Sequence, residues 1–358
     1  MFKIITIFLS LTFFLSFNIH AEIDKFNTYQ WTAGKKTPWF EWWYYKIVLP
    51  ETKESFYFMY GIVNPWDRHN LLKGTRSSVE MGEFKSQTLI KNTFNIDQFH
   101  ASNVQTLVEV AGSTATDQNI KGEVEGIDGE HSYWDISIIN EWAYNAMGWM
   151  IDKDITNIKW YPAQASARCS GTIVSKGKLF QFNNAPCYQD KNWGTSFPIW
   201  WTWIVSNNFK DNPTTALAIG GGRPKYFETT FPYEGVSIGL KHKGKIYHFR
   251  PQDFDNVSVD VKFGKWEIKA NNRTDKIIIS AFAPKEKFMD LQFMTPTGEI
   301  FHDYETLNGD VTVKLYKRYL NGWSLIETLF SDTAGIEFGE PSSANGFKNL
   351  FKTKKNFQ

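Results

Sequence analysis

The sequence predicts an all-β fold made of two barrel- or sandwich-like units, and three observations support this. Short stretches that alternate apolar and polar residues, or that are rich in β-branched and aromatic residues, recur along the 358-residue chain. Tight turn sequences separate several of them, at 176–178, 243–245 and 263–265. No apolar stripe with helical periodicity continues for more than about three turns. Strands at this spacing are typical of barrels and sandwiches.

The expected strands follow one another over most of the chain. They lie at 44–48, 56–63, 104–110, 133–139, 171–175, 178–182, 200–205, 215–219, 235–240, 245–249, 257–263, 266–270, 276–282, 290–294, 311–316 and 325–329. The segment 183–186, Asn-Asn-Ala-Pro, interrupts this pattern, and a dense aromatic segment begins just after it. We therefore expect an N-terminal domain at 22–188, a C-terminal domain at 189–340 and a polar tail at 341–358. Each domain is long enough to bury a core.

The N-terminus has the features of a secretory signal peptide at residues 1–21. Lys3 supplies the positive charge, residues 4–17 are mostly apolar, and Ala21 is a small residue suited to cleavage. The apolar run is shorter than the ~20 residues that cross a bilayer. We expect a secreted or periplasmic protein with no transmembrane segment after cleavage. In that oxidising compartment Cys169 and Cys187 either form a disulfide or remain two buried thiols.

Composition excludes several classes of function. The formal net charge is +1, which argues against a nucleic-acid partner because the phosphate backbone requires a basic surface. Two cysteines exclude a Cys-rich metal centre, and no histidine pair has the spacing of a helical zinc site, so we expect no metal. The triple glycine at 220–222 is not a phosphate loop, because no Lys-Ser/Thr pair and no helix follow it.

Aromatic residues make up 17% of the chain and gather in clusters, most densely at 39–45 and 193–203. Because alternate residues of a strand share a face, Trp42 and Tyr44 are expected on one side of their strand, and Trp201 and Trp203 together on one side of theirs. Such residues either fill a β core or line a wide apolar cavity. A cavity walled by indole rings suits an apolar ligand, a sugar or a transient carbocation.

Several motifs resemble those of the tocopherol cyclase family. The segment 40–46, Phe-Glu-Trp-Trp-Tyr-Tyr-Lys, is similar to the family pattern F-E-G-W-Y-Y/F. The segment 185–194, Ala-Pro-Cys-Tyr-Gln-Asp-Lys-Asn-Trp-Gly, resembles A-P-x-Y-x-E-K-N-W-G, and the segments 220–223 and 334–339 also have counterparts. The match runs in order from 37 to 340. Trp42 replaces the family's usual glycine, and Asp190 replaces the glutamate of the plant enzymes.

This resemblance implies two lipocalin-like β-barrel domains packed together, a fold shared with carotenoid hydratase-like proteins, in an exported bacterial member. It also implies an isomerase, or intramolecular lyase, that cyclises a prenylated quinol. The enzyme protonates the alkene, and a ring hydroxyl then adds to the tertiary cation. The family needs no cofactor for this reaction, and the implied partner is a small apolar ligand such as a prenylated quinol, isoprenoid or lipid. We expect a monomer.

Alkene protonation requires a carboxylic acid that burial keeps neutral. Asp190 is the first candidate, since it lies in the best-matched motif beside aromatic residues; alternatively it is a surface aspartate paired with Lys191. Glu41 is the second candidate; alternatively it is a half-buried carboxylate bonded to an arginine or to backbone. The two acids are the predicted catalytic residues.

Further residues are predicted to bind the ligand. Trp42, Tyr44, Trp193, Trp201 and Trp203 are the expected aromatic wall. Lys191 and Asn192 either hold the quinol oxygens or pin a loop between the domains. Arg223 either anchors a polar head group or forms an ion pair at the domain interface.

Two other functions fit the same pattern. One is a non-catalytic, lipocalin-like carrier of an apolar ligand, and the other is a carbohydrate-binding protein that uses exposed tryptophans. The presence of a carboxylic acid inside an apolar pocket distinguishes the cyclase from the carrier. If Asp190 and Glu41 both faced bulk solvent, the carrier would be favoured.

Overall fold

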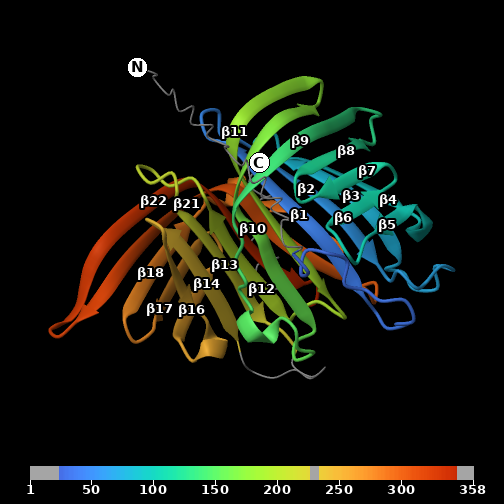
Figure 1. The fold of residues 1–358 in the computed structure, drawn as a ribbon. Coiled ribbons are helices and arrows are strands. Elements are labelled where there is room, and N and C mark those ends of the chain that lie inside the picture. The colour runs from blue at the N-terminus through green and yellow to red at the C-terminus, as the bar shows by residue number, and fades with distance from the viewer. Residues whose placement is uncertain (1–23, 226–233, 345–358) are drawn as a thin grey trace, which may run out of the picture.

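The structure, a computed structural model, describes residues 24–225 and 234–344, and these form two curled antiparallel sheets (Figure 1). The expected signal peptide at 1–21 lies outside the described residues, as does most of the polar tail expected at 341–358. Helical structure in the described ranges is limited to short 3-10 turns: η1 (Ile96–Gln98), η2 (Gly148–Met150), η3 (Pro251–Asp253) and η4 (Lys285–Lys287). None of the described helices is long and apolar enough to span a membrane.

The first sheet has the spatial order β4-β3-β2-β1-β11-β10-β9-β8-β7-β6-β5. Its strands are β1 (Phe40–Leu49), β2 (Glu54–Val63), β3 (Arg76–Glu83), β4 (Thr88–Phe94), β5 (Phe99–Ala101), β6 (Leu107–Val110), β7 (Ser113–Thr116), β8 (Asn119–Glu125), β9 (His131–Trp142), β10 (Ile158–Ser175) and β11 (Lys178–Gly194). The order places β1, the first strand, next to β11, the last strand of this unit. The two segments of the N-terminal unit that best match the family motifs therefore lie side by side.

The second sheet has the order β15-β14-β13-β12-β22-β21-β18-β17-β16, and β19 and β20 also pair with β21. Its strands are β12 (Trp200–Ser206), β13 (Ala216–Arg223), β14 (Gly235–His242), β15 (Lys245–Phe249), β16 (Asn256–Lys262), β17 (Lys265–Asn271), β18 (Asp275–Phe282), β19 (Met289–Asp290), β20 (Phe293–Met294), β21 (Ile300–Tyr319) and β22 (Gly322–Pro341). Here too the first strand, β12, pairs with the last, β22. Both units thus bring their N- and C-terminal strands together.

The predicted all-β fold with two packed units is confirmed. The chain passes from the first sheet to the second at 195–199, so the domain boundary expected at 188/189 falls inside β11. Strands β3, β4, β5, β7 and β8 were not predicted, because β5 and β7 are very short and charged and hydroxyl residues interrupt the alternation of the others. Strand β21 begins at Ile300, well before the expected start at 311. Its first half was missed because polar residues occupy buried positions there and interrupt the apolar pattern.

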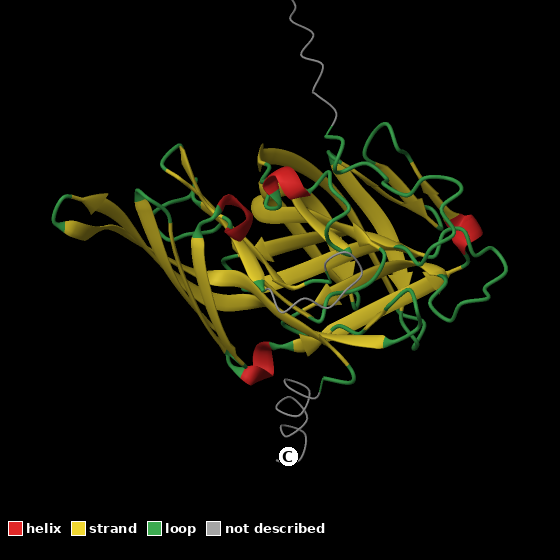
Figure 2. Ribbon diagram, turned by 90° about the horizontal axis from the view of Figure 1, so that it is seen from below, coloured by secondary structure: helices red, strands yellow, loops and turns green. Residues whose placement is uncertain are grey.

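Three groups of buried side chains show how the units pack. One lies inside the first sheet and includes Trp43 and Tyr45. A second lies inside the other sheet. A third lies between the two sheets and includes Trp42, Tyr44 and Trp203, with Trp201 packed against it. The predicted division of aromatic residues between strand faces is therefore confirmed. Figure 2 shows the two curled sheets side by side.

Cys169 on β10 and Cys187 on β11 form a disulfide, with their Cα atoms 5.9 Å apart. The sequence left open whether these residues pair or remain thiols. The bond joins neighbouring strands of the first sheet, and both side chains are buried in its core.

Candidate functional site

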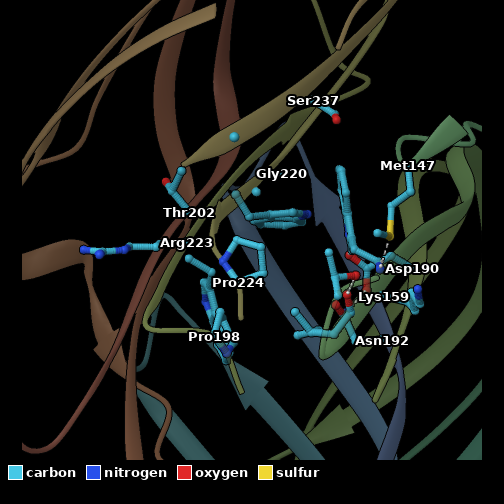
Figure 3. Close-up of a pocket in the computed structure, with 18 of the residues that line it drawn as sticks. Met147, Lys159, Asp190, Asn192, Pro198, Thr202, Gly220, Arg223, Pro224 and Ser237 are labelled. Carbon is cyan, nitrogen blue, oxygen red and sulfur yellow. Dashed lines mark hydrogen bonds between the residues drawn. The ribbon is translucent and has the colours of Figure 1, made fainter. Parts of the chain in front are cut away.

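A cavity of about 430 Å³ lies where the two sheets meet. A volume of this size falls within the range of small-molecule sites. Strands β1, β10 and β11 supply one wall, and β12, β13, β21 and β22 supply the other. Figure 3 shows Asp190, Asn192 and Lys159 on one side and Thr202 and Arg223 on the other. The aromatic residues that line the cavity are Trp42, Tyr44, Trp149, Trp160, Trp200, Trp201, Trp203, Phe254 and Phe293.

The pairing of β1 with β11 decides which predicted residues reach the cavity. Tyr44 lies directly opposite Asp190, and Trp42 lies opposite Asn192. All four side chains line the cavity, because residues two apart on a strand share a face. The residues between them point to the other face of the sheet.

Asp190 is held beneath the aromatic wall and is only 4% exposed. Its Oδ2 accepts a hydrogen bond from the indole N–H of Trp160 and another from the hydroxyl of Tyr188, both at 2.8 Å. The indole N–H of Trp203 in turn donates to the Tyr188 oxygen at 3.1 Å. Asn192 adds a weaker contact, with its Nδ2 3.4 Å from Asp190 Oδ1.

Burial raises the pKa of Asp190 to about 7, and the hydrogen bonds from Trp160 and Tyr188 oppose that rise. Among the described residues, no lysine or arginine forms an ion pair with this carboxyl group. A substantial fraction of Asp190 is therefore a neutral acid at neutral pH, which is the state that a proton donor requires.

The triple glycine has a packing role in this site. A Cβ at Gly220 on β13 would lie 2.7 Å from the Trp160 ring, too close for any side chain. Glycine therefore lets the indole of Trp160 lie flat against β13 while its N–H reaches Asp190. Gly339 on β22 provides the same close approach for Trp201, since a Cβ there would lie 2.4 Å from that ring.

Glu41 and Lys191 form a buried ion pair on the opposite face of the sheet, with Lys191 Nζ 2.9 Å from Glu41 Oε2. Glu41 also accepts hydrogen bonds from the backbone N–H groups of Gln30 and Trp31 and from the indole of Trp39. Neither Glu41 nor Lys191 lines the cavity. The Glu41 carboxylate holds the N-terminal segment in place through these hydrogen bonds. Because it lies outside the cavity, it cannot donate a proton to a ligand bound there.

Lys191 is likewise occupied away from the cavity. Its ammonium lies 4.8 Å from the Trp43 ring centre and 4.6 Å from that of Trp193, and it donates to the Thr28 carbonyl. Burial lowers the pKa of Lys191 to about 8, and Glu41 opposes that change. Lys191 does not pair with Asp190, and Trp193 packs on this far face rather than on the ligand wall.

The remaining predicted residues reach the cavity. Trp201 and Trp203 project from β12, and Arg223 lies at the end of β13. Their place in the cavity wall leaves a ligand-binding role open to all three.

Three more carboxyl groups line the same cavity and were not predicted from the sequence. They are Asp303 and Glu305 on β21 and Glu337 on β22, and one oxygen of each lies within 4.8 Å of the others. Tyr44 donates its hydroxyl to Glu305, and the Trp201 indole donates to Asp303 at 3.3 Å. Asp303 and Glu337 are hydrogen-bonded to each other.

Burial and mutual repulsion keep protons on this cluster. Burial raises the pKa of Glu337 to about 8, and Asp190 adds to the rise. Burial also holds the pKa of Asp303 and of Glu305 well above the ordinary range, and the charge of Glu337 contributes to both shifts. Three oxygen ligands at this spacing also resemble a divalent-cation site. We interpret them as a proton-sharing group, because they bond to one another and to neutral donors.

A signal for this cluster is present in the sequence. Glu337 lies within the segment 334–339 that resembles the family's closing motif, and Asp303 and Glu305 alternate with apolar residues in 300–305. Two carboxylates at alternate positions share one face if the segment is a strand, which indicates an acidic face. The sequence did not show that β21 pairs with β22, which is the pairing that brings the three carboxyl groups together.

Comparison with known proteins agrees with the motifs. The family model described as tocopherol cyclase-like matches residues 37–125 and 110–340. A protein of Oryza sativa subsp. japonica named "Probable tocopherol cyclase, chloroplastic" is 26% identical, over 88% of this chain and 78% of its own. The chloroplastic tocopherol cyclase of Zea mays is 25% identical, over 88% of this chain and 77% of its own.

One solved structure supports the fold. The crystal structure of CghA has a TM-score of 0.52 at 9% sequence identity, and the match covers 86% of this chain and 88% of that protein. At this identity the likeness concerns the fold alone.

Proposed function

Because the chain belongs to the tocopherol cyclase-like family, we propose that it cyclises a prenylated quinol, or a related isoprenoid, by acid catalysis in the cavity between its sheets. The observation that carries this proposal is Asp190, a carboxyl group buried in an aromatic-lined cavity without a cationic partner among the described residues. Exposure of both Asp190 and Glu41 to bulk solvent would favour the carrier. Both side chains are buried, so this condition is not met.

In this proposal the neutral carboxyl of Asp190 transfers its proton to the alkene of the bound ligand. The product is a tertiary carbocation, which the faces of neighbouring aromatic rings stabilise. Trp42, Tyr44 and Trp203 lie around this carboxyl group and supply such faces. A ring hydroxyl of the ligand then adds to the cation. The dry, preorganised wall matters because water would compete for the cation.

Asn192 and Arg223 are the proposed polar contacts of the ligand head group, since both line the cavity. Glu41, Lys191 and Trp193 have no role in this site, because the other face of the sheet holds them. The proposed reaction uses only side chains of this chain and requires no cofactor.

An alternative is a carrier that binds an apolar ligand in the same cavity without changing it. Incubation of the purified protein with a prenylated hydroquinone, followed by chromatography and mass spectrometry, separates the two functions. The cyclase yields a product of unchanged mass that has lost one phenolic hydroxyl, and the carrier returns the ligand intact. Complete return of intact ligand by the folded protein would refute the cyclase.

We further propose that the protein is secreted or periplasmic. The sequence supports this through the signal-peptide features of residues 1–21, and the disulfide between Cys169 and Cys187 is consistent with an oxidising compartment. The mass of the protein recovered from its native host tests the proposal. A mature chain that begins near residue 22 is expected, and an intact Met1 would contradict export with cleavage.

A further inference from the structure

The proposed cyclisation moves two protons, one to the alkene and one from the phenol. It neither gains nor loses atoms overall: one C–H bond and one C–O bond form, while one alkene π bond and one phenolic O–H bond break. Asp190 supplies the proton for the C–H bond and becomes a carboxylate. The phenolic proton then has two possible acceptors, the carboxylate left on Asp190 or a second group on the side from which the hydroxyl oxygen attacks the neighbouring carbon. This inference rests on the proposed function and deepens it.

The second sheet presents such a group to the cavity. In the pairing of its strands, Trp203 lies opposite Glu337, and Glu337 lies opposite Glu305. This row crosses three neighbouring strands and faces the row on the first sheet in which Tyr44 lies opposite Asp190. The acid and the carboxyl cluster are therefore carried by opposite walls of one cavity.

Two hydrogen-bonded bridges join these walls. Tyr44 of the first sheet donates to Glu305 of the second, and Trp203 of the second sheet donates to Tyr188, which donates to Asp190. The bridges fix the two acidic groups relative to each other across the interface. A rigid frame of this kind is what proton transfer at two points of one ligand requires.

We propose that Glu337, supported by Asp303 and Glu305, accepts the phenolic proton of the ligand during ring closure and returns it to Asp190 afterwards. The acceptor is Glu337 in its ionised form, since the pKa of this member of the cluster is raised only to about 8, and its O–H bond forms as the phenolic O–H bond breaks. Return of that proton restores the carboxylic acid of Asp190 and completes the cycle. No oxidant or reductant takes part.

Packing around the cluster explains why it both holds and releases protons. The titratable and charged groups that face it are Tyr44 and Lys46 on β1, Tyr57 on β2 and Asp190 on β11. Lys46 donates to a backbone carbonyl at 3.1 Å, and burial lowers its pKa to about 7. The carboxyl groups thus share protons mainly among themselves and titrate as a coupled set.

The test compares Glu337→Gln and the triple variant Asp303→Asn/Glu305→Gln/Glu337→Gln with wild type on a prenylated hydroquinone. We expect Glu337→Gln to lower kcat about 100-fold with KM nearly unchanged, and the triple variant to lower it further. A ring-fluorinated hydroquinone has a more acidic phenol and needs the acceptor less. It should therefore restore much of the lost rate to both variants but not to Asp190→Asn.

Controls separate this inference from the proposed function. Glu327→Gln lies on the same strand, in a surface ion pair with Lys243, and should behave as wild type. Thermal unfolding and quenching of tryptophan fluorescence by the ligand show that each variant folds and binds. A triple variant within threefold of wild-type kcat, or a loss that the fluorinated ligand does not restore, would overturn the inference while leaving Asp190 in place. An inactive wild type would overturn the proposed function, and the inference with it.

Discussion

The two faces of the β1–β11 strand pair each bury a carboxyl group, and they treat it in opposite ways. On the far face Glu41 lies 2.9 Å from the ammonium of Lys191. It also accepts hydrogen bonds from the backbone N–H groups of Gln30 and Trp31 and from the indole N–H of Trp39. On the cavity face Asp190 accepts hydrogen bonds from neutral donors, Trp160 and Tyr188. Both carboxyl groups are almost fully buried, so burial alone does not distinguish them.

The difference lies in charge compensation. A buried carboxylate with a lysine partner anchors structure through that ion pair, whereas a buried carboxyl group without one keeps its proton into the neutral range. The first is useful for holding a segment and the second for donating a proton. This contrast yields predictions of decreasing size.

The largest expected effect is that of Asp190→Asn. The variant keeps the shape and neutral charge of the protonated acid but has no acidic proton, so kcat should fall about 1,000-fold while KM changes little. Steady-state kinetics with a prenylated hydroquinone measure this. Activity within tenfold of wild type would remove Asp190 as the acid.

Glu41→Gln should instead act on stability. It leaves Lys191 buried without its counter-charge, and loss of one partner of a buried ion pair costs about 3–5 kcal/mol. Urea unfolding should show a correspondingly lower midpoint, while the folded fraction keeps wild-type kcat. A variant as stable as wild type but without activity would reverse the roles assigned to the two faces.

The carboxyl cluster makes stability depend on pH. Burial raises the pKa of Glu337 from 4.5 to about 8, so between these values the folded state binds more protons than the unfolded state. Stability should therefore fall as pH rises through this window. Glu337→Gln should lessen that fall by on the order of 3 kcal/mol between pH 5 and pH 9. Denaturant unfolding at both pH values measures the slope; equal slopes in both proteins would contradict an elevated pKa.

The smallest predicted effect is that of Trp160→Phe, which keeps a ring against Gly220 but removes the N–H that bonds to Asp190. That hydrogen bond favours the carboxylate, so its loss should raise the pKa of Asp190 further above 7. The alkaline limb of the kcat profile, where the acid loses its proton, should move upward by about one pH unit. A shift toward lower pH would show that the indole does not act on this carboxyl group.

The fold class and part of the candidate site could be predicted from the sequence. Alternation assigned Trp42 and Tyr44 to one face, and the family resemblance drew attention to Asp190. The sequence did not distinguish Asp190 from Glu41, because both are acids among aromatic residues. Only the register of β1 against β11 shows that the two side chains point to opposite faces of the sheet. The partner of Glu41 was equally hidden, since Lys191 reaches it across the strand pair.

The carboxyl cluster was out of reach for a related reason. Glu305 and Glu337 are distant in sequence and meet only through the pairing of β21 with β22. The polar residues that form the cluster also concealed the first half of β21, because they break the apolar pattern by which strands are recognised. Local sequence rules thus failed at the buried polar positions of this strand.

The central claim is that Asp190 carries a proton inside the cavity at neutral pH. Infrared difference spectra between wild type and Asp190→Asn, recorded from pH 5 to pH 9, test it directly through the carbonyl stretch of the protonated carboxyl group. We expect a band that is present in wild type at pH 6, absent from the variant, and lost as pH rises through about 7. A carboxylate signal from Asp190 already complete at pH 5 would contradict it.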